Sequence, residues 1–291
     1  MATPHITPDV TDTDSTEPLL CVEDFGVELI TATGVVRAVD TVSFSIAAGE
    51  TVAVIGESGS GKSTTAMGVL GLLPDDLAVR SGAVRYRGRD ILGDADALHE
   101  VRGREIALIP QDPMAALSPV HTVGSQLREA VAHSGVRGRR AQREQCVELL
   151  RQVRIPNPEH QLGRYPHQFS GGMLQRVLIA AALASSPRLV VADEPTSALD
   201  VTVQAGILDL LMGLQERTGV GMLIITHDLG VARLVADRIH VMKEGRFVEA
   251  GPADDIVDTP QSPYTKKLLD AVPRLGPWSL PGEPVTAGAT A

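Results

Sequence analysis

The segment that most constrains this chain is residues 55–64, which contain the pattern G-x-x-x-x-G-K-[ST] of a phosphate-binding loop. An apolar run over residues 51–55 leads into the loop, and apolar residues at helical spacing follow it. A strand, a glycine-rich turn and a helix in this order aim backbone N–H groups at phosphate oxygens. A chance glycine-rich turn would not carry both flanking patterns. We therefore predict a phosphate site formed by Gly56, Glu57, Ser58, Gly59, Ser60, Gly61, Lys62, Ser63 and Thr64.

A second apolar run, over residues 189–192, ends in the acids Asp193 and Glu194. Such a run is typical of a buried parallel strand, and ligands of α/β proteins bind at the carboxyl ends of these strands. Together with the loop, this predicts that Lys62 contacts the β- and γ-phosphates and that Ser63 and Asp193 hold Mg²⁺. Glu194 is then placed to polarise the attacking water. The alternative is an Asp-Glu-Pro turn that only leaves the strand.

The remaining hydrophobic pattern predicts an α/β fold with an antiparallel region at its start. Short, partly alternating runs come before the loop, whereas continuous apolar runs alternate with helical patterns after it. This alternation is typical of a core whose ligand lies at the strand ends. Strands are predicted at 20–22, 27–30, 35–36, 42–46, 106–109, 189–193 and 222–226. One more strand and a turn are predicted over 82–86 and 91–92, and a hairpin at 238–250. Helices are predicted within 115–165, from 171 and over 202–217.

Composition excludes several classes of protein. The net charge of −10 and the pI near 5.3 argue against nonspecific nucleic-acid binding, so we expect no nucleic-acid partner. No apolar run approaches the roughly 18–20 residues that span a bilayer, and the start of the chain lacks the features of a signal peptide. The two cysteines are far apart and predict free thiols. Residues 1–18 and 273–291 have the composition of a disordered and a flexible tail.

Further motifs resemble the ATP-binding cassette (ABC) ATPases, and they occur in the order of that family. Gln111 resembles the family's Q-loop glutamine, and residues 170–172 (Ser-Gly-Gly) resemble its signature sequence. Residues 197–200 resemble the D-loop, and His227 resembles the switch histidine. The resemblance implies a P-loop NTPase (RecA-like) core over residues 19–272, with an antiparallel β subdomain. It also implies an inserted α-helical subdomain near 112–184 and a C-terminal extension near 251–272.

The resemblance also implies how such a chain uses ATP and Mg²⁺. Two cassettes would bind two ATP head to tail, each between one chain's phosphate loop and the other chain's signature helix. Gln111 would contact the metal and report the γ-phosphate to a membrane partner, and His227 would orient Glu194 and water. The resemblance implies that the catalytic residues are Glu194, His227 and Gln111. It implies that the metal ligands are Ser63, Gln111 and Asp193. Further nucleotide contacts are implied for Ser170, Gly171, Gly172 and Asp200.

Longer segments resemble the ATPase subunits of oligopeptide, dipeptide and nickel importers. They are residues 111–114, 165–177, 193–204 and 262–269. The resemblance implies a second ATPase subunit, two transmembrane permeases, an extracytoplasmic solute-binding protein and a peripheral location on the cytoplasmic face of the membrane. The Phe-Ser-Gly-Gly-Met form favours a heterodimer of related ATPases. A non-transport ABC ATPase, such as an accessory subunit of a phosphonate-degrading complex, stays open as the alternative.

One position departs from the family pattern. Family members carry an aromatic residue about two dozen positions before the loop, where it stacks on adenine, but Thr33 stands near that place here. Phe25 lies earlier in the chain, and Val36 or Val39 offers an apolar contact instead. We therefore expect only a modest preference for ATP over GTP.

Overall fold

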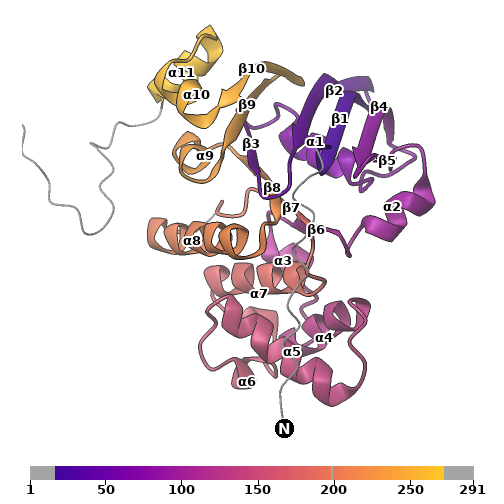
Figure 1. The fold of residues 1–291 in the computed structure, drawn as a ribbon, viewed down its shortest axis with the longest axis vertical. Coiled ribbons are helices and arrows are strands. Elements are labelled where there is room, and N and C mark those ends of the chain that lie inside the picture. The colour runs from indigo at the N-terminus through magenta and orange to yellow at the C-terminus, as the bar shows by residue number, and fades with distance from the viewer. Residues whose placement is uncertain (1–16, 198, 272–291) are drawn as a thin grey trace, which may run out of the picture.

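A computed structural model describes residues 17–197 and 199–271, and its centre is a mixed six-stranded sheet (Figure 1). Five neighbouring strands run parallel, and β10 pairs antiparallel with β9 at one edge. The order β10-β9-β3-β8-β7-β6 places the strand that leads into the phosphate loop beside β8. The strands are β3 (Thr51–Ile55), β6 (Ile106–Ile109), β7 (Leu189–Asp193), β8 (Gly221–Thr226), β9 (Arg238–Lys243) and β10 (Arg246–Pro252).

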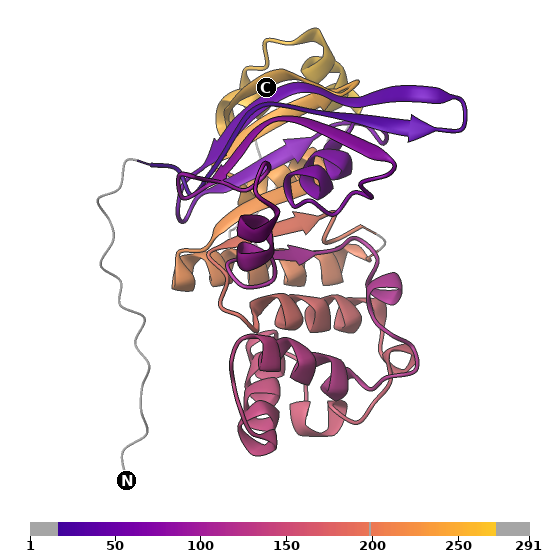
Figure 2. The same ribbon diagram turned by 90° about the vertical axis from the view of Figure 1, so that its right-hand side faces the viewer.

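A second, antiparallel sheet has the order β2-β1-β4-β5, and its long β1–β2 hairpin projects from the body of the molecule (Figure 2). The short runs predicted before the loop join into two long strands with irregular register. The strand and turn predicted over 82–86 and 91–92 correspond to β4 and to the chain after β5, where Ile91 is fully buried in the core. The strands are β1 (Leu20–Thr31), β2 (Gly34–Ile46), β4 (Ala78–Tyr86) and β5 (Arg89–Asp90).

Helix α1 (Lys62–Val69) contacts strands of both sheets, so the two sheets share one hydrophobic core. Phe25 belongs to this core, and its ring lies so close to Gly68 that a Cβ there would be 2.9 Å from the ring. Phe25 is fully buried and therefore does not reach an adenine base. The adjacent α2 (Ala95–Val101) covers the edge near β5.

Helices α3 to α7 lie between β6 and β7 in the chain and build a second core at one end of the molecule (Figure 1). The predicted stripe of Val123, Leu127 and Val131 is buried, which confirms the amphipathic pattern of α4. The elements are α3 (Pro113–Ala116), α4 (Val123–His133), α5 (Arg139–Gln152), α6 (Pro158–Gln161), the 3₁₀ turn η1 (Pro166–Gln168) and α7 (Gly171–Leu183).

Helices α9 to α11 cover the sheet on the side of β9 and β10, whereas α8 packs against α7. Leu268 and Leu269 of α11 pack against a cluster that includes Ile55, the residue before the loop. The predicted tails and Trp278 lie outside the described residues, apart from residues 17 and 18. The helices are α8 (Val201–Thr218), α9 (Leu229–Val235), α10 (Ala253–Asp258) and α11 (Pro263–Ala271).

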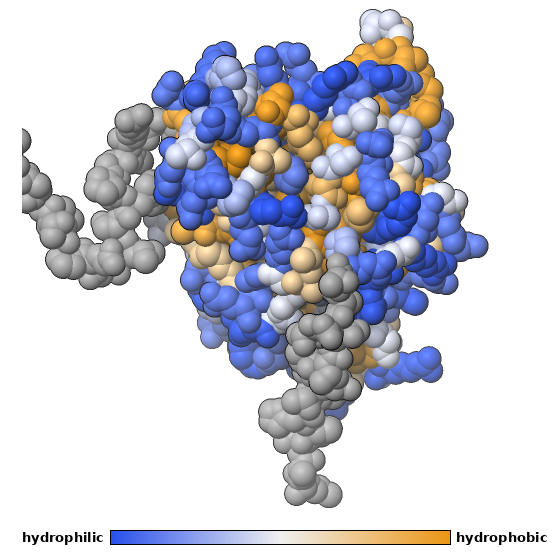
Figure 3. Space-filling model, turned by 45° about the horizontal axis from the view of Figure 1, so that its top comes forward, coloured by the Kyte–Doolittle hydropathy of each residue, from blue (hydrophilic) through white to orange (hydrophobic). Residues whose placement is uncertain are grey.

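On the face shown in Figure 3, most side chains are hydrophilic and apolar side chains lie among them. Exposed apolar side chains are normal on a folded protein. Among the helices of residues 17–197 and 199–271, none has the length and apolar character needed to cross a membrane. Cys21 and Cys146 are both free, as predicted.

Candidate nucleotide-binding site

The phosphate loop connects β3 to α1 and is held by two close backbone approaches. A Cβ at Gly56 would lie 2.2 Å from the Met242 carbonyl oxygen, and one at Gly61 would lie 2.5 Å from the Ala38 carbonyl oxygen. Gly61 also has φ 105°, a conformation that side chains disfavour. Both glycines are therefore required for the loop to pass between β9 and β2 in this shape.

The donor groups of the loop fit an anion. Lys62 begins α1, and the first intrahelical bond runs from Thr65 N to Gly61 O, so the N–H groups of the first turn lack helical acceptors. The buried Lys62 ammonium donates to the carbonyl oxygens of Gly56 at 2.8 Å and Glu57 at 2.9 Å. Burial lowers the pKa of Lys62, while Glu194 and Asp193 oppose this effect. The buried Ser60 hydroxyl has no hydrogen-bond partner among the residues that the structure describes. A bound phosphate would satisfy these donors.

A pair of oxygen ligands lies where the loop meets the end of β7. The Ser63 hydroxyl donates to Asp193 Oδ1 at 2.8 Å. Asp193 is buried, and burial raises the pKa of its carboxyl, whereas the hydrogen bond from Ser63 lowers it. A hydroxyl and a carboxylate next to a phosphate site are the ligand types that Mg²⁺ uses. These two residues therefore fit a magnesium ion.

Glu194 lies at the centre of the predicted catalytic group. Its two carboxylate oxygens are contacted by Gln111 Nε2 at 3.0 Å and His227 Nδ1 at 3.2 Å. These residues follow the ends of the neighbouring strands β6, β7 and β8, which explains why they meet. Glu194 adopts a left-handed backbone conformation with φ 45° and its N–H donates to Ile225 O. Sequence patterns gave no sign of this rare conformation, which turns the chain sharply after Asp193.

The signature and D-loop residues form a separate group. Ser170 caps α7 by accepting from Met173 N, and Asp200 caps α8 by accepting from Val203 N. The two helices touch at Gly172, where a Cβ would lie 2.3 Å from Val203 Cγ1. Within the described chain, no hydrogen bond joins Ser170 or Asp200 to the phosphate loop. The exposed N-termini of α7 and α8 are therefore not tied to this chain's own phosphate loop by hydrogen bonds among the described residues.

The residues considered as adenine contacts differ in how much of their side chains is exposed. Thr33 is exposed in the turn of the β1–β2 hairpin, Val39 is fully buried, and Val36 is 50% exposed. Val39 is therefore unavailable to a base, and Val36 is the remaining apolar candidate.

Sequence reasoning missed one contact to the loop. The Tyr264 hydroxyl, on α11, accepts from Glu57 N at 3.3 Å. The residues around Tyr264 were noted only for their resemblance to importer subunits, and no spacing pattern connects them to residue 57.

The fold and site together define a P-loop nucleoside triphosphatase. A phosphate loop, a buried acid beside a serine, and a carboxylate held by a glutamine and a histidine lie on the adjacent strands β3, β8, β7 and β6.

Comparisons with known proteins narrow this class. The model of the "ABC transporter" family matches residues 39–197, and the model "Oligopeptide/dipeptide transporter, C-terminal region" matches residues 248–289. The dipeptide transport ATP-binding protein DppD of Bacillus subtilis is 47% identical over 261 residues, covering 89% of this chain and 78% of DppD. The oligopeptide transport ATP-binding protein OppD of Mycobacterium tuberculosis is 50% identical over 260 residues, covering 89% of this chain and 42% of OppD.

Solved structures of ABC transporter proteins are also similar to this chain. The dimeric post-hydrolysis cassette MJ0796 bound to ADP and Pi has a TM-score of 0.71 and 29% identity, covering 80% of this chain and 98% of that one. CbiO1 from Clostridium perfringens has a TM-score of 0.70 and 27% identity, covering 88% and 96%. The chain belongs to the ABC transporter family, and it is an ATP-binding, ATP-hydrolysing cassette. The predicted fold class and family are confirmed.

Proposed function

We propose that this chain is one of two ATPase subunits that power an importer of peptides, nickel or a similar small solute. The observation that carries the proposal is the match of residues 248–289 to the oligopeptide/dipeptide transporter C-terminal region. The names of the relatives, which are dipeptide and oligopeptide transport proteins, support the same cargo class. They do not favour the alternative of a phosphonate-complex subunit.

At the nucleotide, each residue has a role that follows from its position. Lys62 leaves its two carbonyl acceptors and donates to the β- and γ-phosphate oxygens, while the N–H groups of the first turn of α1 bind the remaining oxygens. Ser63 and Asp193 would hold Mg²⁺, with Gln111 near, and this ion would neutralise charge on the phosphates. Glu194 accepts a proton from the attacking water, and His227 orients Glu194 and contacts the γ-phosphate.

The signature group completes a second chain's site. Ser170 and the N–H groups of Gly171 and Gly172 lie at the exposed N-terminus of α7, which suits an anion held by a partner's loop. Asp200 stands at the start of α8 beside it and contacts the partner's nucleotide site. The partner would be a related but different ATPase paired head to tail with this chain, and the dimeric form of the cassette MJ0796 supports the pairing of two cassettes.

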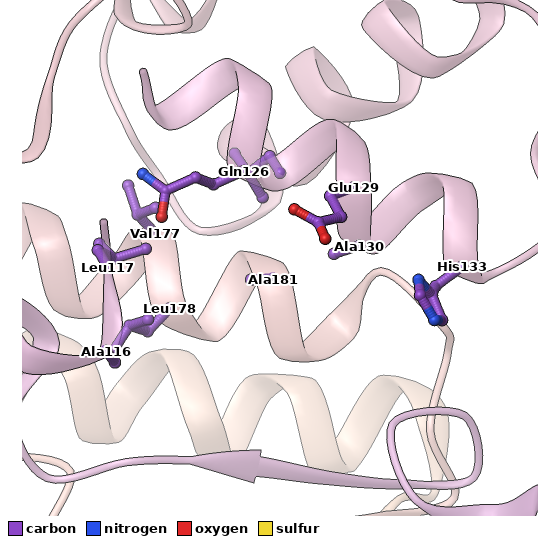
Figure 4. Close-up of a pocket in the computed structure, with 10 residues that line it drawn as sticks. Ala116, Leu117, Gln126, Glu129, Ala130, His133, Val177, Leu178 and Ala181 are labelled. Atoms are coloured by element: carbon purple, nitrogen blue, oxygen red, sulfur yellow. The ribbon is translucent and has the colours of Figure 1, made fainter. Parts of the chain in front are cut away.

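The permease docks on the helical subdomain. A hollow of about 310 Å³ lies between α3, α4 and α7 (Figure 4). Leu117, Val177 and Leu178 line it with apolar side chains, and polar side chains line the remainder. A hollow with both apolar and polar lining suits a short amphipathic helix of a membrane protein. Gln111 is close in sequence to α3, so contact with the γ-phosphate would reach the docked permease. In this arrangement the chain lies on the cytoplasmic face of the membrane, below the permeases and the extracytoplasmic binding protein.

Val36 provides an apolar contact to adenine in place of the usual aromatic residue. Replacing it in Val36→Tyr would add a stacking ring, and base stacking is worth about 1–3 kcal/mol. We expect ATP to bind at least about fivefold more tightly, with a larger ratio of GTP to ATP dissociation constants, in titrations of the isolated subunit. Val35→Tyr is the matched control, because neighbouring strand residues point to opposite faces and Val35 is also exposed. Equal effects of the two variants would contradict the assignment.

Purification of the tagged chain from native membranes tests the transport function. We expect a second ATPase and two permeases in stable amounts, and loss of the gene should abolish uptake of the cargo. Uptake should return with the wild-type chain but not with Lys62→Ala, which removes the cation of the loop. Recovery of lyase proteins without permeases would show that the chain serves another complex.

A further inference from the structure

We infer that Tyr264 is a positioning residue of the phosphate loop, through which the segment 261–271 raises the affinity of the cassette for ATP. The inference rests on ATP binding by this chain and holds for any cargo. It concerns a contact between residues that are 207 positions apart.

Tyr264 contacts the loop residue whose carbonyl oxygen also accepts from the loop lysine. Its hydroxyl accepts from Glu57 N at 3.3 Å, while the carbonyl oxygen of Glu57 accepts from Lys62 Nζ at 2.9 Å and from Ser60 N at 3.2 Å. Glu57 is thus held at its N–H by the C-terminal segment and at its carbonyl by the loop itself. When a bound phosphate takes over the hydrogen bonds of Lys62, the Tyr264 contact remains and keeps the part of the loop around Glu57 in place. A loop that is ordered before binding loses less entropy when the ligand arrives.

The sequence around Tyr264 is anchored so that the ring cannot easily move away. The Glu249 carboxylate on β10 accepts from Gln261 N at 2.6 Å and from Ser262 N at 3.2 Å, at the entry to α11. The Lys243 ammonium lies 5.3 Å from the centre of the Tyr264 ring. Leu268 and Leu269 pack against the cluster that contains Ile55. Three independent contacts therefore direct one hydroxyl to one loop amide.

A purely structural role for Tyr264 is the competing explanation. The ring is partly buried and packs against the same cluster, so removal of the whole side chain would destabilise the fold in either case. Tyr264→Phe separates the two explanations, because it keeps the ring and its contact with Lys243 and removes only the hydroxyl. Tyr165→Phe is the matched control, since Tyr165 is an exposed tyrosine in the helical subdomain.

The first measurement is the affinity of the isolated subunit for Mg-ATP. A hydrogen bond of this kind contributes about 0.5–1.5 kcal/mol, so Tyr264→Phe should weaken binding by roughly two- to tenfold, while Tyr165→Phe leaves it unchanged. In the nucleotide-free protein, hydrogen exchange of residues 55–64 should be faster in Tyr264→Phe and normal elsewhere. The melting temperature without nucleotide should change little.

The second measurement tests whether bound ATP, in turn, stabilises the docked segment 261–271. If docking of the segment favours ATP, then ATP must favour docking of the segment. Mg-ATP should therefore slow hydrogen exchange over residues 261–271 in the wild type and in Tyr165→Phe, but not in Tyr264→Phe. Glu249→Ala, which removes the two hydrogen bonds at the entry to α11, should weaken ATP binding in the same direction. Wild-type affinity and loop exchange in Tyr264→Phe would overturn the inference, as would a general loss of stability with uniformly faster exchange.

Discussion

In Glu194→Gln, Mg-ATP binding is expected to persist while turnover of the assembled transporter falls at least about 10²-fold. Glutamine keeps the size of the side chain and much of its hydrogen bonding to Gln111 and His227. It cannot accept the proton that leaves the attacking water, so the chemical step is slowed and the ATP-bound state accumulates. Binding is measured by titration of the isolated subunit, and turnover by phosphate release from the complex.

Glu216→Gln is the control for this experiment, because it removes the same charge from an exposed position on α8. It should leave both binding and turnover near the wild-type values. Turnover close to normal in Glu194→Gln would show that another group accepts the proton, and loss of ATP binding would show that Glu194 serves mainly to hold the site together.

In Ser170→Arg, turnover at the partner's nucleotide should collapse, while the mutated chain alone binds ATP with unchanged affinity. The variant places a large cation at the N-terminus of α7, where a small hydroxyl and backbone N–H groups would meet the partner's γ-phosphate. The bulk blocks close approach of the two chains. In the described part of the chain, Ser170 makes no hydrogen bond to the loop around Lys62, so the chain's own ATP is unaffected.

Ser170→Ala separates this steric effect from loss of the helix cap. Both variants remove the hydroxyl that accepts from Met173 N, and loss of such a cap costs about 1 kcal/mol of stability. Turnover in the alanine variant should fall much less than in the arginine variant, because the backbone donors stay accessible. Complexes in which only this chain is mutated are compared by phosphate release. If Ser170→Arg abolished ATP binding by the lone subunit, the assignment of Ser170 to the partner's site would be wrong.

The parts of the site that follow local rules could be predicted from the sequence. The phosphate loop is continuous in the chain, and Asp193 ends a run whose apolar character requires a buried parallel strand. Because parallel strands present their carboxyl ends at one edge, Gln111, Glu194 and His227 could be expected to meet. The family order of the motifs supported the same grouping.

The remaining features depend on contacts between distant segments. Phe25 has the spacing of a strand residue, but only the packing of α1 against β1 shows that its ring is buried beside Gly68. Tyr264 reaches Glu57 because α11 returns to the sheet, and no local periodicity records that return. The short runs of the first sheet join into long strands because pairing between strands, rather than residue propensity, sets their length.

The contact of Gly172 with Val203 has a consequence for how two bound nucleotides affect each other. The start of α8 follows Glu194 by a few residues, and α8 packs at this point on the helix that begins after Ser170. A shift of the chain after Glu194 during hydrolysis would therefore move Ser170 as well, because no space separates Gly172 from the valine. The two sites of a dimer would then respond cooperatively, and the dependence of turnover on ATP concentration would be sigmoidal rather than hyperbolic.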